Sequence, residues 1–273
     1  MRTWLAPLTT ATKALAALSL SFALLPPASA PAGDSLDRIV GTVRSIVDAP
    51  IPDIEEVRAR CGGDPLCAAR LLAAAIGPEA RLERVEHPDT DEIRGVRSEP
   101  SVTGAVLAPD GTARIVLDRF GRAAVREIED SLQNLTGRGE VRRLILDLRA
   151  NGGGDFKRML KVAALFTGAV PEAVILRGKN GTVQIGIPAA ERLAAGLPVA
   201  VWVGPQTASS AEILAALLRV HAGAEIVGAR TFGKNYLLRS ISVVHDWRLL
   251  VPAERIEVPG TAIAGGRIPD RAQ

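Results

Sequence analysis

The segment from Val199 to Lys234 constrains the fold more than any other part of the sequence. It opens as a short valine-rich run, breaks at Gly204 and Pro205, and continues with apolar residues at the spacing of a helix. This order predicts a strand, a tight turn and a helix. Strands and helices alternate in the same way elsewhere in the chain, which predicts an α/β fold with crossover connections.

Residues 102–273 are predicted to form this α/β core. The predicted strands, besides the valine-rich run that starts at Val199, are Val102–Leu107, Thr112–Leu117, Leu144–Leu148, Val174–Leu176, Ile226–Gly228, Leu237–Val244 and Arg248–Val251. The predicted helices, besides the one that follows Pro205, are Val125–Leu135, Phe156–Phe166 and Ala189–Ala195.

Ser209 and Ser210 stand at the predicted start of the helix that follows Pro205. The backbone N–H groups of a first helical turn lack intrahelical partners, so a nucleophile at this place would have oxyanion donors beside it. The spacing from Ser209 to Glu212 is also that of a capping box, which begins a helix without any chemistry. This segment alone favours the cap over the nucleophile.

Two other segments have features that are typical of a catalytic cleft. Residues 144–154, LILDLRANGGG, form a buried strand that leads into three glycines. Glycines at a strand end can adopt positive φ and direct N–H groups at a ligand. The second segment is TFGK at residues 231–234. Its Lys234 would be an ordinary surface residue unless a dry cleft stabilises the neutral amine, which can then act as a general base.

Four segments in this order closely resemble the motifs of the C-terminal processing, or tail-specific, serine peptidases. They are LILDLRANGGG from Leu144, TASSAEIL from Thr207, IVGARTFGK from Ile226 and GGRIPD from Gly265. The similarity extends over about residues 112–270. It implies the family's crotonase- or Clp-protease-like α/β core. It also implies an endopeptidase that hydrolyses peptide bonds in protein or peptide substrates, with no metal and no other cofactor.

The resemblance also implies roles for individual residues. Ser209 matches the family's nucleophile and Lys234 its general base, so the two would form a Ser/Lys dyad. The oxyanion donors would be the N–H of Ser210 and one N–H of the glycine loop. That second donor matches Gly153, with Gly154 as the alternative.

Four further residues are expected to support this site. Asp147 and Arg149 match the family's D-L-R sequence and are expected to hold the glycine loop rather than to take part in the chemistry. Glu212 is expected to cap the helix that presents the nucleophile. Leu238 stands where the family usually has a glutamine that holds the lysine amine, so the support would come from another group, with Gln206 as a candidate.

The chain departs from the family pattern in two other ways. Asn235 stands where a glycine commonly follows the lysine. The connector over residues 81–101 is too short for the PDZ domain of the family, which predicts that this domain is absent.

Three functions other than a Ser/Lys endopeptidase fit some of these sequence features. A catalytically weak or silent relative would bind peptides or hydrophobic ligands in the same cleft, which Leu238 and the missing PDZ domain favour. An acyl-CoA-type enzyme also uses a glycine-loop oxyanion hole, but the N-terminal leader argues against a CoA substrate. A Ser/His/acid triad would need His221 or His245, and neither stands in a family motif.

The N-terminus has the pattern of a cleaved secretory signal over residues 1–32. Arg2 and Lys13 precede an apolar run that ends in small residues, with cleavage predicted after Ala32. The protein would be secreted across the inner membrane, periplasmic in a Gram-negative source, and away from the membrane after cleavage. The two leader cations account for most of the excess of 33 Lys and Arg over 30 Asp and Glu, so charge gives no support to nucleic-acid binding.

Residues 33–80 are predicted to form a small helical lobe. Its helices cover Ser35–Val47, Ile54–Arg60 and Leu66–Ala75. In an oxidising compartment, Cys61 and Cys67 would form a disulfide across the Gly/Pro turn between them. A metal site would need further ligands that the remote histidines do not supply, and a redox pair is usually spaced more tightly.

Overall fold

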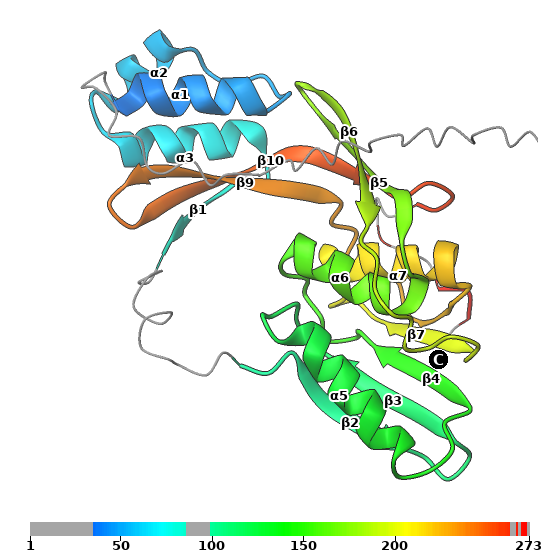
Figure 1. Cartoon of the computed structure of the whole chain (residues 1–273). Coiled ribbons are helices and arrows are strands. Elements are labelled where there is room, and N and C mark those ends of the chain that lie inside the picture. The colour runs from blue at the N-terminus through cyan, green and yellow to red at the C-terminus, as the bar shows by residue number, and fades with distance from the viewer. Residues whose placement is uncertain (1–34, 86–98, 263–265, 267–268, 272–273) are drawn as a thin grey trace, which may run out of the picture. The chain divides into compact units, whose positions relative to one another are not determined.

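The computed structural model describes residues 35–85, 99–262, 266 and 269–271 (Figure 1). The signal predicted over residues 1–32, most of the connector and part of the GGRIPD motif lie outside the described residues. Within the described ranges, every helix is too short or too polar to span a membrane.

A five-stranded sheet, which we name the core sheet, forms the centre of the predicted core. Its strand order is β2-β3-β4-β7-β8. The strands are β2 (Val102–Leu107), β3 (Thr112–Leu117), β4 (Arg143–Asp147), β7 (Val199–Val203) and β8 (Glu225–Gly228). β2 and β3 form an antiparallel hairpin, whereas β3, β4, β7 and β8 are parallel. The α/β prediction is therefore confirmed.

Three helices connect these strands and supply one face of the core. They are α5 (Ala124–Thr136), α6 (Phe156–Thr167) and α7 (Ser210–Ala222). β3 alternates as a strand with one covered face should: Ala113, Ile115 and Leu117 are fully buried, and the residues between them are partly exposed. These side chains pack in one cluster with apolar residues of all three helices.

The remaining strands form a second, antiparallel sheet in the order β1-β10-β5-β6, with β9 also paired to β10. Its strands are β1 (Arg81–Arg84), β5 (Val170–Gly178), β6 (Gly181–Ile187), β9 (Tyr236–Val244) and β10 (Trp247–Glu257). The predicted strands Leu237–Val244 and Arg248–Val251 lie within β9 and β10, which pair antiparallel. β5 and β6 are joined at Lys179-Asn180 and form a hairpin.

The three N-terminal helices are α1 (Ser35–Ile46), α2 (Ile54–Cys61) and α3 (Pro65–Ile76), as predicted. Cys61 and Cys67 form the predicted disulfide. The helices do not form a core by themselves, because their apolar side chains pack with Ile241, Val251 and other residues of β9 and β10. The lobe therefore also contains strands from the C-terminal part of the chain.

The prediction of a helix over Ala189–Ala195 is wrong. The chain forms only a turn there, over residues 193–196. The Leu193 N–H donates to the Leu165 carbonyl oxygen at 2.8 Å, so it is not available for a helical bond. Pro188 and Pro198 bracket a segment too short to nucleate a helix without strong packing.

Candidate active site

Ser209 lies between β7 and α7 in a strained backbone conformation. Its φ is 55° and its ψ is −124°. Asp53 and Asp155, which cap α2 and α6 through their side chains, have the extended backbone that is usual at a helix start. A non-glycine residue at positive φ costs on the order of 1–3 kcal/mol and persists only where its neighbours hold it. A serine that served only as a cap would not need this conformation.

Glu212 provides much of that restraint. Its side chain is fully buried on the first turn of α7. Oε2 accepts hydrogen bonds from the N–H groups of Ser209, at 2.9 Å, and Lys234, at 2.8 Å. Oε1 accepts from the Thr231 hydroxyl at 2.5 Å and the Gly233 N–H at 2.6 Å. We name this arrangement the Glu212 clamp. It joins the helix start to the TFGK segment.

The Glu212 clamp brings together two residues that are 25 positions apart in the sequence. Because one oxygen accepts from both, the backbone nitrogens of Ser209 and Lys234 lie within about 6 Å of each other. Both side chains are half-buried, so neither is sealed in the core. The bond from Ser209 N–H to Glu212 is the carboxylate half of the predicted capping box, and the bonds to the TFGK segment are additional.

The glycine loop contacts the same helix start. Gly153 has a φ of 108°, and a Cβ there would lie 2.9 Å from the Ser209 Cβ and 3.3 Å from the Ser210 nitrogen. No larger residue fits at this position. The Ser210 hydroxyl donates to the Gly154 carbonyl oxygen at 2.9 Å. The Ser210 N–H has no hydrogen-bond acceptor within the part of the chain that the structure describes.

Asn151 fixes the glycine loop, and sequence reasoning did not single it out. Its side chain is fully buried. Nδ2 donates to the Leu117 carbonyl oxygen at 2.9 Å, and Oδ1 accepts from the Gly153 N–H at 2.8 Å. The Asn151 carbonyl oxygen accepts from the Ala208 N–H at 3.1 Å. An amide residue directly before the glycines was the only available signal for this role.

Asp147 and Arg149 form a bidentate pair at the end of β4. The Arg149 guanidinium donates to the buried Asp147 carboxylate at 2.9 and 2.7 Å. Hydrogen bonding to Asp147 raises the pKa of Arg149 above its ordinary value. Arg149 also lies over the Trp202 ring, 4.7 Å from its centroid. These contacts fix the strand end from which the glycine loop starts.

The Lys234 amine has no hydrogen-bond or ion-pair partner among the described residues. Leu238 lies on β9 opposite Pro252 of β10, and the exposed Gln206 makes no hydrogen bond to Lys234. Asn235 does not need to be glycine, because its φ is not positive and its carbonyl oxygen accepts from the Ile256 N–H at 2.7 Å.

The histidines are not placed to assist Ser209. His221 is near the last residue of α7, about 18 Å along the helix axis from Ser209 at the usual rise per residue. His245 lies at the turn between β9 and β10, where the adjacent Asp246 pairs with Arg84. Within the described ranges, no group of three or more His, Cys, Asp or Glu side chains could hold a metal ion.

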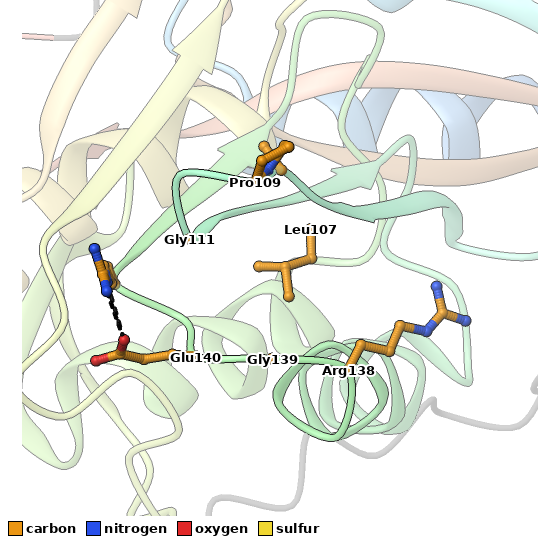
Figure 2. Close-up of a pocket in the computed structure, with 8 residues that line it drawn as sticks. Leu107, Pro109, Gly111, Arg138, Gly139 and Glu140 are labelled. Atoms are coloured by element: carbon orange, nitrogen blue, oxygen red, sulfur yellow. Dashed lines mark hydrogen bonds and ion pairs between the residues drawn. The ribbon is translucent and has the colours of Figure 1, made fainter.

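Two hollows lie at opposite ends of the parallel strands of the core sheet. One, of about 350 Å³, lies between the β2–β3 turn and the connection from α5 to β4, and contains none of the predicted site residues (Figure 2). Figure 2 shows the ion pair that Glu140 forms there with Arg142. The other, of about 620 Å³, is lined by Arg149, Gln206 and small or apolar residues at the carboxyl ends of β7 and β8. Parallel α/β sheets usually bind ligands at that end of their strands.

Peptidase family S41 matches residues 111–270 of this chain. The carboxy-terminal processing protease CtpA of Bacillus subtilis strain 168 is 30% identical over 147 residues, 54% of this chain and 30% of the relative. The carboxyl-terminal-processing protease of Synechocystis sp. is 34% identical over 148 residues, 53% of this chain and 33% of the relative. The chain thus spans about a third of the length of these curated relatives.

Solved structures agree on the fold. A lipoprotein from Streptococcus agalactiae superposes with a TM-score of 0.65 at 16% identity, covering 89% of this chain and 93% of its own. A photosystem II D1 C-terminal processing protease gives a TM-score of 0.53 at 23% identity, covering 72% of this chain and 48% of its own. At these identities the likeness concerns the fold alone.

Proposed function

Because the chain belongs to peptidase family S41, as its motifs indicated, we propose that it is a serine endopeptidase with a dyad of Ser209 and Lys234. The observation that carries this proposal is the Glu212 clamp, which holds the backbones of both residues on one buried carboxylate. The structural neighbours support the fold that such a site needs.

The proposed reaction starts from the neutral Lys234 amine. It removes the Ser209 hydroxyl proton while Oγ attacks the carbonyl carbon of the peptide bond. The tetrahedral oxyanion accepts hydrogen bonds from the Ser210 N–H and from the glycine loop. The Lys234 ammonium then protonates the leaving amine. Water hydrolyses the acyl-enzyme, and its proton passes through Lys234 back to Ser209.

The second oxyanion donor is assigned to Gly153, with Gly154 as the alternative. Gly153 lies against Ser209 and Ser210, as the assignment requires. Its N–H already donates to Asn151 Oδ1, so the substrate oxygen must replace or share that acceptor if Gly153 is the donor. Gly154 is held by the Ser210 hydroxyl through its carbonyl oxygen.

The proposed substrates are proteins or peptides that an enzyme outside the cytoplasm would meet. The predicted leader over residues 1–32 supports secretion, with a periplasmic location if the source is Gram-negative. The Cys61–Cys67 disulfide supports an oxidising compartment.

One observation favours a second candidate, a catalytically weak or silent relative that binds peptides or hydrophobic ligands in the same cleft. The Lys234 amine lacks an acceptor among the described residues, and Leu238 occupies the position of the family's usual glutamine. An amine that nothing orients spends less time in line with the serine hydroxyl.

A serine-directed acylating probe separates these two functions. We expect stoichiometric labelling of the wild-type protein in assays from neutral to alkaline pH, because Lys234 acts as the base that activates Ser209. Ser209→Ala should abolish the labelling, and the matched variant Ser210→Ala should retain it. If the folded wild-type protein takes up no probe over that pH range, the silent binder is the correct function.

Replacing Leu238 with glutamine is expected to raise kcat by about tenfold, because a side-chain oxygen would orient the Lys234 amine. The measurement is the steady-state hydrolysis of an unstructured fluorogenic peptide. Leu238→Met is the matched control, since it keeps the apolar volume and adds only a weakly accepting sulfur in place of an amide oxygen. Equal kcat values for the two variants would show that residue 238 does not act on the lysine.

A further inference from the structure

Strand β6 is the last strand on its side of the second sheet. It pairs with β5, and no other described strand pairs with it. Its first four residues, 181–184, are exposed. The outer edge of this strand therefore presents backbone N–H and C=O groups that are ready to pair with another strand.

β6 lacks two of the features that usually protect such an edge, charged residues and proline. Its sequence, Gly-Thr-Val-Gln-Ile-Gly-Ile, has no charged residue and no proline. By contrast, β1 at the other end of the same sheet is Arg-Leu-Glu-Arg. β2, at the edge of the core sheet, is also uncharged, and its pairing with β3 is irregular between Val102 and Gly104, as the pairing of β6 with β5 is between Val170 and Val174. β6 therefore offers an edge for strand addition without the charges that β1 carries and without the Arg239 of β9, which pairs only with β10 among the described strands.

The apolar face of the second sheet stops abruptly at β6. Val183 lies opposite Leu176 of β5, and Ile185 lies opposite Val174, so these four side chains share one face. Leu176 and Val174 are buried, whereas Val183 is 52% exposed. A further strand beside β6 would continue this face and cover Val183.

We propose that β6 is the contact surface of a symmetric dimer, in which two copies of this chain pair antiparallel through β6. Centred on Gln184, this pairing places Val183 opposite the partner's Ile185 and Ile185 opposite the partner's Val183. β-Branched pairs across strands are favourable, and an uncharged strand opposes its own copy without repulsion. The assembly stops at two copies, because the pairing uses the free edge of β6 in both chains.

The proposed interface is small. A single strand pair with the side chains around it lies at the lower end of the area range of specific interfaces, so we expect a dissociation constant in the micromolar range. The proposal is independent of the Ser209/Lys234 chemistry, since neither residue lies on β6.

Charge substitutions at Gln184 test both the surface and the register. Gln184 is exposed and would lie opposite the partner's Gln184 at the two-fold axis. Like charges directly opposite each other destabilise strand pairing, so Gln184→Lys and Gln184→Glu should each be monomeric where the wild type is dimeric. An equimolar mixture of the two variants should recover the dimer. Sedimentation velocity from about 1 to about 100 µM brackets the expected dissociation constant.

Val106→Lys is the matched control. Val106 is exposed to a similar extent, 54%, but lies on β2 of the core sheet, so this variant should dimerise as the wild type does. Circular dichroism would check that all variants are folded. Three results would overturn the proposal: a monomeric wild type over the whole range, dimerisation that both Gln184 variants retain, or a mixture that stays monomeric.

Discussion

Replacing Ser209 with alanine is expected to lower kcat/KM for peptide hydrolysis by about 10⁴-fold or more, and Lys234→Ala should do the same. The first change removes the nucleophile and the second removes the group that takes its proton. Because the two residues act as one unit, the double variant should be no slower than either single variant. The measurement is the hydrolysis of an unstructured fluorogenic peptide at saturating and subsaturating concentrations.

Two matched variants make this result specific. Ser210→Ala removes the neighbouring hydroxyl, which donates to the Gly154 carbonyl oxygen, but keeps the Ser210 backbone N–H. We expect it to retain kcat/KM within about tenfold, the effect of one neutral hydrogen bond. Lys234→Arg keeps a long basic side chain, but its guanidinium stays protonated and cannot accept the Ser209 proton, so this variant should be as inactive as Lys234→Ala. A Ser209→Ala protein as active as the wild type would exclude the dyad.

The spacing of apolar residues predicted the core of this fold well, because each long helix or strand shows the hydrophobic period of its own type. The alternation in β3 and the valine-rich run of β7 identify strands whose burial the structure repeats. The prediction of a short helix over Ala189–Ala195 was wrong because it relied on a local pattern alone. Its pattern covers too few residues, and the bond from the Leu193 N–H to the Leu165 carbonyl oxygen is a tertiary contact that no local period contains.

Contacts between distant segments could not be predicted from patterns. The sequence assigned the N-terminal lobe to helices alone, yet Ile241 and Val251 of the C-terminal strands complete its core. Asn151 likewise gains its role from Leu117 and Ala208, which stand 34 positions before it and 57 after it. Nothing in the sequence next to Asn151 indicates either partner.

The local pattern around Ser209 allowed a cap or a nucleophile, the family resemblance favoured the nucleophile, and backbone geometry bears on the same choice. Positive φ cannot be predicted for a serine from its neighbours, since most residues avoid it. Ordinary N-caps in this chain, such as Asp53, have an extended backbone instead. The strain at Ser209, together with the approach of Gly153, favours a residue that is held for chemistry.

The second large effect is expected at Glu212. Glu212→Ala removes the acceptor of four hydrogen bonds and leaves the N–H groups of Ser209, Gly233 and Lys234 without it. Hydrogen bonds to a charged acceptor contribute about 1.5–3 kcal/mol each, and not additively, so the free energy of unfolding should fall by about 4 kcal/mol. Ser209 and Lys234 would also lose their common anchor, so kcat should fall by about 100-fold or more in protein that remains folded.

Glu212→Gln should lower stability and kcat less than Glu212→Ala does, because only one of the two carboxylate oxygens is replaced. A glutamine keeps one carbonyl oxygen, which can still accept from Ser209 and Lys234, while its NH₂ group can donate to the Thr231 hydroxyl oxygen. The Gly233 N–H and the Thr231 O–H then lose Oε1 as their acceptor. This variant should lose about 1–3 kcal/mol of stability and keep more of its kcat than Glu212→Ala.

Glu127 supplies the control that separates stability from positioning. Its carboxylate accepts from the N–H groups of Ser101, at 2.7 Å, and Val102, at 3.0 Å, and neither belongs to the candidate site. Glu127→Ala should therefore lower the free energy of unfolding without lowering kcat, measured well below the unfolding temperature. If Glu212→Ala behaved in the same way, with reduced stability and unchanged kcat, the Glu212 clamp would be a structural contact only. A loss of kcat in Glu212→Ala but not in Glu127→Ala would instead show that the shared carboxylate keeps Ser209 and Lys234 correctly positioned relative to each other.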